Sequence, residues 1–401
     1  MMFDVATGGE RVRRLLQTAV DSGQIPGAVA LVRCGGQVQI NEAFGCAELT
    51  PVRRDMHKDT VFDLASLTKP LAATAVALAL VDRGEVSLDE EVTRYLPELA
   101  RVRGAGVTIR RLLTHSSGLS GWRPLYTRSR GREEILTAIA DLGISYPPGS
   151  RFEYSDLGLI TLGILAERVG GERLDALAAR LVFDPLGLRD TGYLPGRDAT
   201  RYATTEDGNA FERRMADWAS LNFDGWRRGC YPGEVNDGNA HYGLGGVSGH
   251  AGLFSTAHDV GVLGQLWLDR GTYDGTRVLS EAVVGLATTN QSPEGHAPRG
   301  LGWALASTQP PGRAELTRAD AGFFPPAASP WSPRSCGELL SERAFGHTGF
   351  TGTSLWCDPA TGLVAVLLAN ATHPVVDPST GMDRLRARFH NVVAASLTPV
   401  G

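Results

Sequence analysis

Hydrophobic and polar positions divide the chain into strand-like segments near both ends and helix-like segments between them. Residues 10–22 have the spacing of an amphipathic helix. Two apolar runs, residues 28–32 and 38–40, flank Gly35-Gly36, a pattern typical of a β-hairpin. Strand-like segments return near the C-terminus, before a final amphipathic helix, at residues 301–305, 353–356 and 363–368.

Helical patterns dominate the middle of the chain. Apolar positions recur at helical spacing over residues 71–83, 133–141, 159–169, 174–181 and 259–269. This order predicts an α+β fold: one antiparallel sheet built from both chain ends and flanked by terminal helices, with a large, mainly helical inserted domain. We expect a sheet domain of residues 1–60 and 300–401, a helical domain of residues 61–299, and an active site between them.

Two irregular stretches interrupt these patterns. Residues 189–249 are rich in Gly, Trp and Asn, and their Trp and Tyr content favours a role in lining a site. Residues 309–334 are rich in Pro and Ser, and we expect this segment to be mobile.

Lysine is almost absent from the chain, which has two lysines, Lys58 and Lys69, against thirty-seven arginines. A lysine kept in such a background suggests a role that arginine cannot fill, because a buried ammonium can lose its proton and a guanidinium cannot. Lys69 stands three residues after Ser66, and the apolar stretch after Pro70 predicts a helix that begins near Ser66. Ser66 and Lys69 then share one helical face, which makes the serine a candidate activated nucleophile.

Three later segments add groups that such a nucleophile needs. Residues 151–156 place the phenol of Tyr154 and the carboxylate of Asp156 at a loop-to-helix junction. Residues 345–353 form a glycine-spaced strand, Phe-Gly-His-Thr-Gly-Phe-Thr-Gly-Thr, whose small residues let a substrate backbone approach closely. Residues 112–119 end a helix in a turn that carries His115.

These elements occur in the order S-x-x-K, Y-S-N-like and K-T-G-like, and nearly the whole chain resembles the serine β-lactamase and penicillin-binding-protein superfamily. The likeness is nearest to its class C β-lactamase-like branch, which includes D-amino-acid peptidases and carboxylesterases. Residues 249–256, Gly-His-Ala-Gly-Leu-Phe-Ser-Thr, are also typical of such proteins. The resemblance implies a β-lactamase/transpeptidase-like fold and a serine hydrolase that works through an acyl-enzyme.

The resemblance also implies the roles of the matching residues. Ser66 is the acylated nucleophile and Lys69 helps to remove its proton, while Tyr154 acts as general base and then as acid toward the leaving group. Whether Lys69 or Tyr154 is the base stays open. The backbone N–H groups of Ser66 and Phe350 form the oxyanion hole. The substrate is aligned by the strand residues His347, Thr348 and Gly349.

The chain departs from the family pattern at two positions. Asp156 stands where the family usually has asparagine, and an anion about 4 Å from Lys69 stabilises the ammonium by up to roughly 4 kcal/mol. We expect Asp156 mainly to orient Lys69. His347 replaces the usual lysine of the third element, and a histidine is largely uncharged at pH 7. A substrate carboxylate would then be held weakly, which favours ester or amide substrates without a charge over β-lactams.

The composition and the remaining histidines bear on the possible partners, the location and metal binding. A net charge of −5 with no basic run argues against nucleic acid as a partner. No secretory-type apolar core lies at the N-terminus and no run is long enough to span a bilayer, so we expect a cytoplasmic protein, or a periplasmic one if a signal has been removed. His115 and His250 are expected to make structural hydrogen bonds, with a smaller chance that His250 reaches the site. Since His241, His250 and His258 match no zinc motif, we expect neither metal nor cofactor.

The leading hypothesis is therefore a serine hydrolase of the carboxylesterase or D-amino-acid amidase/peptidase type, acting on a small molecule or short peptide. A true β-lactamase or D,D-carboxypeptidase is the first alternative. A non-catalytic protein that kept the fold is the second, although the joint presence of Ser66, Lys69 and Tyr154 argues against it. The absence of a G-x-S-x-G motif argues against an α/β-hydrolase.

Overall fold

A computed structural model describes most of the chain. It covers residues 1–401 except 195, 197, 230, 293–295, 297, 307–334 and 400–401, and except the side chains of residues 199 and 218. The segment 309–334, predicted to be mobile, lies outside the described residues.

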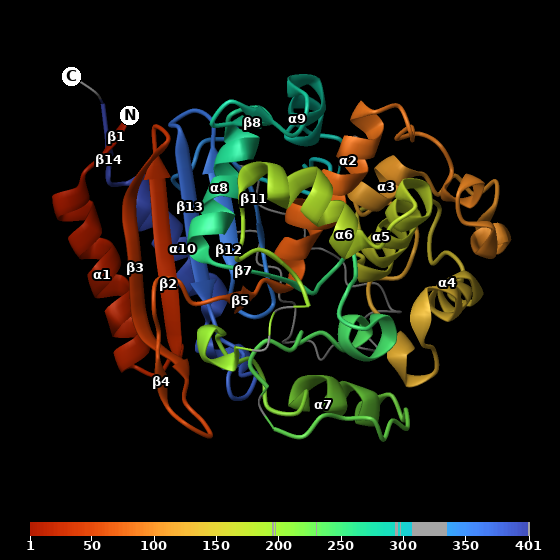
Figure 1. The fold of residues 1–401 in the computed structure, drawn as a ribbon, viewed down its shortest axis with the longest axis horizontal. Coiled ribbons are helices and arrows are strands. Elements are labelled where there is room, and N and C mark those ends of the chain that lie inside the picture. Colours follow the sequence, from red (N-terminus) through yellow and green to blue (C-terminus); the bar gives the residue numbers. More distant parts are fainter. Residues whose placement is uncertain are drawn as a thin grey trace.

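A seven-stranded sheet forms the centre of the fold, with the order β10-β11-β12-β13-β2-β3-β4 and antiparallel neighbours throughout (Figure 1). Its strands come from both chain ends, as predicted: β2 (Gly27–Cys34), β3 (Gln37–Glu48), β4 (Arg54–Asp55), β10 (Ala304–Leu305), β11 (Phe345–Thr348), β12 (Ser354–Asp358) and β13 (Leu363–Ala369). The pairing of β13 with β2, from Leu363–Cys34 to Ala369–Ala28, joins the two ends. The antiparallel sheet expected from the hydrophobic pattern is thus confirmed.

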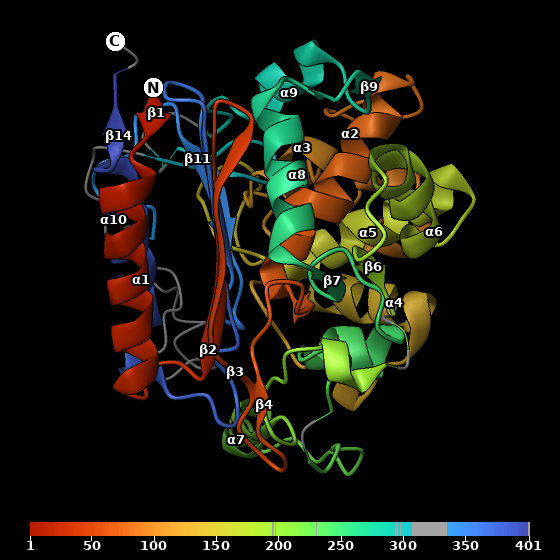
Figure 2. The same ribbon diagram turned by 60° about the vertical axis from the view of Figure 1, so that its left-hand side comes forward.

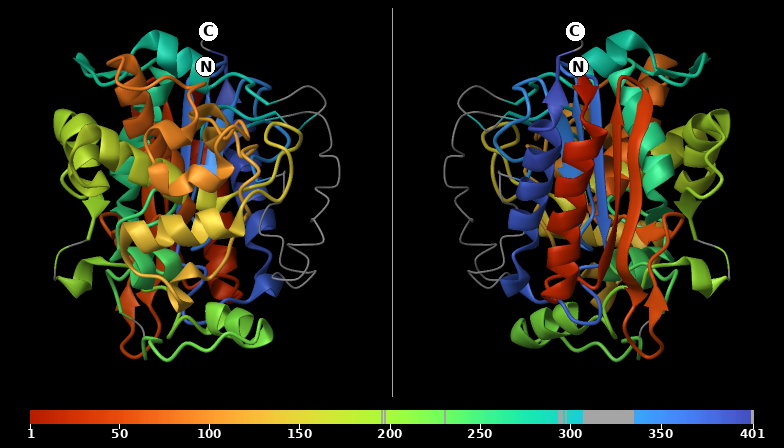
Figure 3. Two further views of the ribbon diagram at one scale, coloured as in Figure 1. Left: turned by 90° about the vertical axis from the view of Figure 1, so that its right-hand side faces the viewer. Right: turned by 90° about the vertical axis from the view of Figure 1, so that its left-hand side faces the viewer.

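Both faces of the sheet are buried. Helices α1 (Val5–Asp21) and α10 (Met382–Ala394) cover one face, and α8 (Ala257–Leu268) covers the other (Figure 2). Along β2, Ala28, Ala30 and Val32 pack toward the terminal helices, whereas Val29 and Leu31 pack toward the helical part. This alternation is the two-residue period of a strand. The short strands β1 (Met2–Phe3) and β14 (Leu397–Thr398) pair beside the two termini (Figure 3).

The remaining helices and strands lie mainly between β4 and β10. The helices are α2 (Ala75–Asp82), α3 (Ile109–Leu113), α4 (Gly131–Leu142), α5 (Asp156–Gly170), α6 (Leu174–Ala178), α7 (Ala210–Trp218) and α9 (Glu281–Ala287). The strands are β5 (Phe62–Asp63), β6 (Gly192–Tyr193), β7 (Leu253–Ser255), β8 (Thr272–Tyr273) and β9 (Thr276–Arg277). The 3₁₀ and π turns are η1 (Ala65–Leu67), η2 (Lys69–Thr74), η3 (Val92–Arg94), η4 (Pro97–Val102), η5 (Leu125–Thr127), η6 (Ala179–Phe183), η7 (Asp184–Leu186), η8 (Ala199–Arg201), η9 (Asn239–Gly243) and η10 (Pro378–Thr380). The domain boundaries near residues 60 and 300 stay a prediction.

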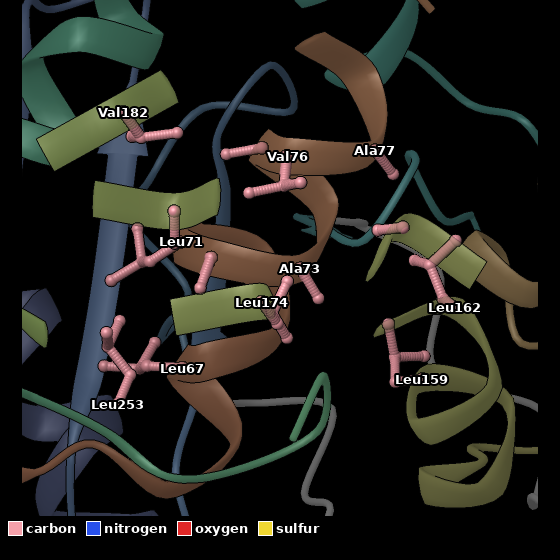
Figure 4. Packing of buried hydrophobic residues seen from close by; sticks show 14 of the residues in the cluster. Leu67, Leu71, Ala73, Val76, Ala77, Leu159, Leu162, Leu174, Val182 and Leu253 are labelled. Carbon is pink, nitrogen blue, oxygen red and sulfur yellow. The ribbon is translucent and has the colours of Figure 1, made fainter. Parts of the chain in front are cut away.

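The helix that begins near Ser66 is the centre of the larger hydrophobic core. Its side chains pack against α5, α6 and the segment before α8 (Figure 4), and the labelled residues are Leu67, Leu71, Ala73, Val76, Ala77, Leu159, Leu162, Leu174, Val182 and Leu253. Residues 65–82 are long and apolar enough to cross a membrane, but 89% of that window is buried inside the protein. Each fully buried leucine contributes about 1.5–3 kcal/mol relative to an exposed one, so the packing holds the start of this helix firmly.

Predicted residues 301–305 are only partly a strand. The ladder begins at Ala304, because Gly302 has a φ of +73° and its N–H donates to the carbonyl of Leu113 instead of to a neighbouring strand. The strand prediction was wrong for the first three residues of this segment.

Candidate active site

Ser66 lies in a tight turn that three hydrogen bonds hold in place. The preceding residue, Ala65, has a φ of +47°, which is rare for a residue with a side chain and is typical of functional sites. Its N–H donates to Oδ1 of Asp63 at 2.8 Å. The Oγ1 of Thr353 donates to the carbonyl of Leu64 at 3.0 Å, and the Oγ1 of Thr351 donates to that of Asp63 at 2.7 Å. The sheet and the helical part therefore fix this turn together.

Lys69 lies one turn after Ser66 and is fully buried. Its Nζ donates to the Oγ of Ser66 at 2.7 Å and to the carbonyl of His250 at 3.1 Å. The same Nζ lies 2.7 Å from Oδ1 of Asp156. Oxygen atoms of Ser66, His250 and Asp156 thus surround the amine of Lys69.

The charge state of Lys69 follows from two opposed effects. Burial alone lowers the pKa of Lys69, but the charges of Asp156 and Tyr154 raise it, and the result is a pKa above the ordinary lysine value. A raised pKa favours the ammonium form of Lys69 at neutral pH.

Tyr154 completes the group. Nζ of Lys69 lies 4.8 Å from the centre of the Tyr154 ring. Burial raises the pKa of Tyr154, Lys69 lowers it and Asp156 raises it, so that the pKa lies above the ordinary tyrosine value. Ser155 begins α5 as its N-cap, with Oγ accepting from the N–H of Gly158 at 2.9 Å, and this cap fixes Tyr154 and Asp156 on either side of it.

Two neutral histidines border Tyr154. The His115 ring stacks on the Tyr154 ring with centroids 4.4 Å apart, and the His347 ring lies 6.0 Å from it. Burial and then the positive charges of Arg299 and Lys69 lower the pKa of both histidines well below the ordinary value. Nδ1 of His115 accepts from the N–H of Ser155 at 3.0 Å, so the neutral ring carries its proton on Nε2. His347 thus supplies no positive charge for a substrate.

The glycine of the third motif sits where no side chain fits. A Cβ on Gly349 would lie 2.1 Å from Oγ1 of Thr353 and 2.3 Å from the carbonyl oxygen of Leu64. This close approach brings the end of β11, with Thr348 buried before it and Phe350 after it, against the turn of Ser66. The buried Arg386 holds the carbonyl of Gly349 at 2.5 Å from the other side.

The structure adds two supporting residues that the sequence did not reveal, Asn236 and Asp237. The N–H of Asn236 donates to Oδ2 of Asp63, 2.7 Å away, below the Ser66 turn. Oδ1 of Asp237 lies 2.8 Å from Nε2 of His250, whose Nδ1 is 2.7 Å from Oγ of Ser248. His250 therefore does make structural hydrogen bonds with its ring, and it reaches the site through its carbonyl. Two adjacent residues of the long irregular stretch thereby support both the nucleophile turn and the lysine.

Aromatic residues from the same stretch lie beside the end of β11. The ring of Phe211, from α7, lies 5.4 Å from that of Phe350, and it belongs with Trp122, Tyr126, Phe223, Trp226 and Tyr242 to one apolar cluster. The expectation that residues 189–249 line the site rested on this aromatic content, and the contact with Phe350 brings the cluster next to the predicted oxyanion strand.

The fold and the arrangement of Ser66, Lys69 and Tyr154 define a class of proteins. The chain belongs to the β-lactamase family, because the family model described as Beta-lactamase matches residues 12–388. It is a serine hydrolase of this family. The resemblance inferred from the motifs is thereby confirmed.

Individual relatives and solved structures agree with this family. The "N-acetylmuramyl-L-alanine amidase" of Bacillus subtilis (strain 168) is 31% identical over 393 residues, covering 92% of this chain and 82% of the relative. The "Putative D-alanyl-D-alanine carboxypeptidase" of Escherichia coli (strain K12) is 30% identical over 393 residues, covering 91% and 83%. The structure of "EstCE1, a hydrolase with promiscuous acyltransferase activity" has a TM-score of 0.70 at 24% identity, with 97% of this chain and 99% of that chain covered. A class C β-lactamase has a TM-score of 0.68 at 19% identity, with 98% and 99% covered. At these identities the two structures show a shared fold.

Proposed function

We propose that the protein is an acyl-enzyme amidase that cleaves amide bonds in peptides or amino-acid derivatives, with Ser66 as nucleophile. The observation that carries the proposal is the 2.7 Å contact between Oγ of Ser66 and a buried Lys69 ammonium, with Tyr154 beside both. A hydroxyl that faces an oriented cation and a phenol in a buried site has what a serine nucleophile requires.

Tyr154 is the general base in this proposal, since Lys69 is held as a cation. Tyr154 first loses its own proton to water, and the Lys69 ammonium beside it stabilises the phenolate, while burial and Asp156 hold the pKa of Tyr154 above its ordinary value. The phenolate takes the proton of Ser66 as Oγ attacks the carbonyl carbon, and an oxyanion forms on the carbonyl oxygen. The backbone N–H groups of Ser66 and Phe350 are the proposed donors to that oxyanion, a contribution of about 3–4 kcal/mol per donor in serine proteases.

Amide substrates differ from ester substrates in their leaving group, which is an amine. When the C–N bond breaks, the departing nitrogen needs a proton, and the phenol of Tyr154, which now carries the proton of Ser66, donates it. Its raised pKa suits a proton that must be kept until the amine accepts it. Water then attacks the acyl-enzyme, Tyr154 takes its proton, and Ser66 leaves with that proton restored. The residues His347, Thr348 and Gly349 are proposed to align the substrate along the end of β11.

The names of the relatives support amide substrates. The Bacillus subtilis relative is named an amidase and the Escherichia coli relative is named a "Putative D-alanyl-D-alanine carboxypeptidase", and both names describe enzymes that cleave amide bonds. The carboxylesterase type, favoured equally by the sequence, remains a second candidate, because burial lowers the pKa of His347 and leaves that residue without a charge for a substrate carboxylate. A cytoplasmic location also stays a proposal.

A substrate panel tests the proposed function. We would measure kcat/KM of the wild type and of Ser66→Ala on D- and L-amino-acid amides, short peptides, p-nitrophenyl butyrate and nitrocefin. The proposal predicts amide turnover that Ser66→Ala abolishes, and ester turnover faster than nitrocefin turnover. Esters cleaved with no turnover of any amide would favour the carboxylesterase, and nitrocefin cleaved as fast as the ester would favour the β-lactamase.

A further inference from the structure

Arg386 connects the last helix of the chain to the motif that ends β11. It lies on α10, which covers the face of the sheet opposite α8 (Figure 2). Although it is an arginine, only 4% of its surface is exposed. Its Nη2 donates to the carbonyl of Gly349 at 2.5 Å, and its Nη1 donates to Oδ1 of Asp383 at 2.8 Å. The guanidinium is therefore held between a carboxylate of its own helix and the backbone of the third motif.

The carbonyl that Arg386 holds belongs to the peptide unit between Gly349 and Phe350. This peptide is trans, and a trans peptide is planar, with its C=O and N–H groups pointing in opposite directions. A donor that fixes the direction of the Gly349 carbonyl therefore also fixes the direction of the Phe350 N–H, which points away from Arg386. That N–H is the second of the two proposed donors to the oxyanion.

Neutral hydrogen bonds hold the same peptide from within its own turn. The N–H of Gly349 donates to the carbonyl of Thr353 at 2.8 Å, and the N–H of Gly352 donates to the carbonyl of Gly349 at 3.1 Å. Arg386 adds a charged donor to this carbonyl, and charge-assisted hydrogen bonds are roughly twice as strong as neutral ones. A bond of this kind also polarises the peptide, so that its N–H becomes a stronger donor.

We infer that Arg386 is a positioning residue of the oxyanion hole, which orients and polarises the Phe350 N–H through the carbonyl of Gly349. The inference rests on the proposed function, because it takes the Phe350 N–H as a donor to the oxyanion. Arg386 lies outside the three motifs and acts through the peptide. Its contribution should therefore appear when negative charge develops on the substrate oxygen, and not when the substrate binds.

A merely structural role of Arg386 needs to be distinguished from this one, because a buried ion pair can also affect stability alone. Sulfur is a weaker hydrogen-bond acceptor than oxygen. An oxyanion hole that works through N–H donors therefore favours a P=O probe over the same probe with P=S. Misplaced donors reduce that preference, whereas a general loss of structure slows both probes alike.

Labelling of Ser66 by a fluorophosphonate and by its P=S counterpart tests the inference without any amide turnover. We would measure both rates, with the adduct mapped to Ser66, for wild type, Arg386→Met, Arg386→Lys and, as control, Arg388→Met. Arg388 is exposed on the same helix.

The two probes should respond differently to Arg386→Met. We expect the P=O probe to react about 10–100-fold more slowly, which is less than the roughly 10²–10³-fold cost of removing an oxyanion donor outright. The P=S probe should slow by less than about threefold, because it depends less on the N–H donors. Arg386→Lys keeps the charge without the planar fork and should lie between wild type and Arg386→Met. Arg388→Met should match wild type with both probes.

Steady-state kinetics on p-nitrophenyl butyrate provides a second measure, in which Arg386→Met should lower kcat and leave KM nearly unchanged. An unchanged ratio of the P=O to the P=S labelling rate in Arg386→Met would overturn the inference and leave Ser66 as the nucleophile. Wild type that is not labelled at Ser66 would overturn the proposed function, and this inference with it. If Arg386→Met shows no cooperative thermal unfolding, the ratio for Arg386→Lys is used in its place, and an unchanged ratio overturns the inference.

Discussion

Lys69 and Asp156 form an ion pair inside the protein, with Nζ and Oδ1 2.7 Å apart and the lysine fully buried. The pair explains why this chain can use aspartate where asparagine is usual. An asparagine oxygen can orient the ammonium, but a carboxylate also fixes its charge. In the proposed mechanism the lysine serves as a cation and Tyr154 transfers the proton.

The pH profile of Asp156→Asn tests this division of roles. Asp156 raises the pKa of both Lys69 and Tyr154. The proposed mechanism requires ionised Tyr154, which sets the acid limb, and protonated Lys69, which sets the alkaline limb. Removing the anion lowers both pKa values, so both limbs of kcat/KM should move to lower pH.

The loss of activity in Asp156→Asn should be moderate. Because asparagine can still orient Lys69, activity at the new optimum should fall by less than about 100-fold, the lower end of what loss of an acid–base group costs. Collapse of activity at every pH, or a shift of the limbs to higher pH, would contradict the role given to Asp156.

The packing of Gly349 yields a second prediction. In Gly349→Ala the new Cβ meets the backbone oxygen of Leu64, so the end of β11 must move away from the Ser66 turn. Overpacking of this kind costs about 1–3 kcal/mol, and a misplaced oxyanion donor adds a loss of kcat. The melting temperature (Tm) and kcat of Gly349→Ala should both be lower than those of wild type.

Gly285→Ala is the matched control. Gly285 lies in α9 with open space around it, and alanine is the better helix former, so this variant should be as stable as wild type or slightly more stable. Gly349→Ala with unchanged kcat would show that β11 does not need this close approach.

Asp237 yields a third prediction, about positioning. In Asp237→Ala the His250 ring loses its 2.8 Å partner, and the carbonyl that holds Lys69 is less well fixed. We expect a loss of about 1.5–3 kcal/mol of stability and a lower kcat with a nearly unchanged KM, since Asp237 acts through Lys69. Asp237→Asn should recover part of both, and the exposed Asp224→Ala should change neither.

The stability difference should also depend on pH. Burial raises the pKa of Asp237 but His250 lowers it by more, so the folded-state pKa lies below the ordinary aspartate value. The stabilisation by Asp237 is therefore present above that value and is lost as the pH falls through the folded-state pKa. The gap in Tm between wild type and Asp237→Ala should narrow below about pH 4. A gap that widens there would contradict a stabilising contact between Asp237 and His250.

Much of this architecture follows from short-range patterns. The alternation in β2 and β13 and the three-residue spacing of Ser66 and Lys69 depend on local geometry, so the sequence predicts the sheet and the first motif. The apolar residues of segment 301–305 predict a strand, but the N–H of Gly302 donates to the carbonyl of Leu113, which is distant in sequence. The strand propensity of individual residues contains no information on such a contact.

The supporting residues were hidden for the same reason. Asn236 and Asp237 lie in an irregular segment, and nothing in their immediate neighbours marks them among the other asparagines and aspartates of the chain. They become significant only when the fold brings them to Asp63 and His250. Lys69, in contrast, could be identified as a candidate from the sequence alone, because lysine is so rare in this chain.

The two lysines provide a fourth prediction. Lys69→Arg places a larger, permanently charged group in a fully buried position, where it cannot keep the geometry of Nζ between Ser66, Asp156 and the carbonyl of His250. We expect kcat/KM to fall by about 100-fold or more, as for loss of an acid–base group. Lys58 is exposed, and Lys58→Arg should be indistinguishable from wild type.

Intact-protein mass spectrometry after reaction with a fluorophosphonate probe tests the central role of Ser66 most directly. We predict one adduct per chain, mapped by peptide analysis to Ser66, absent in Ser66→Ala and formed about 10²–10⁴-fold more slowly in Tyr154→Phe. An adduct on another residue, or one that forms equally fast in Ser66→Ala, would contradict the account.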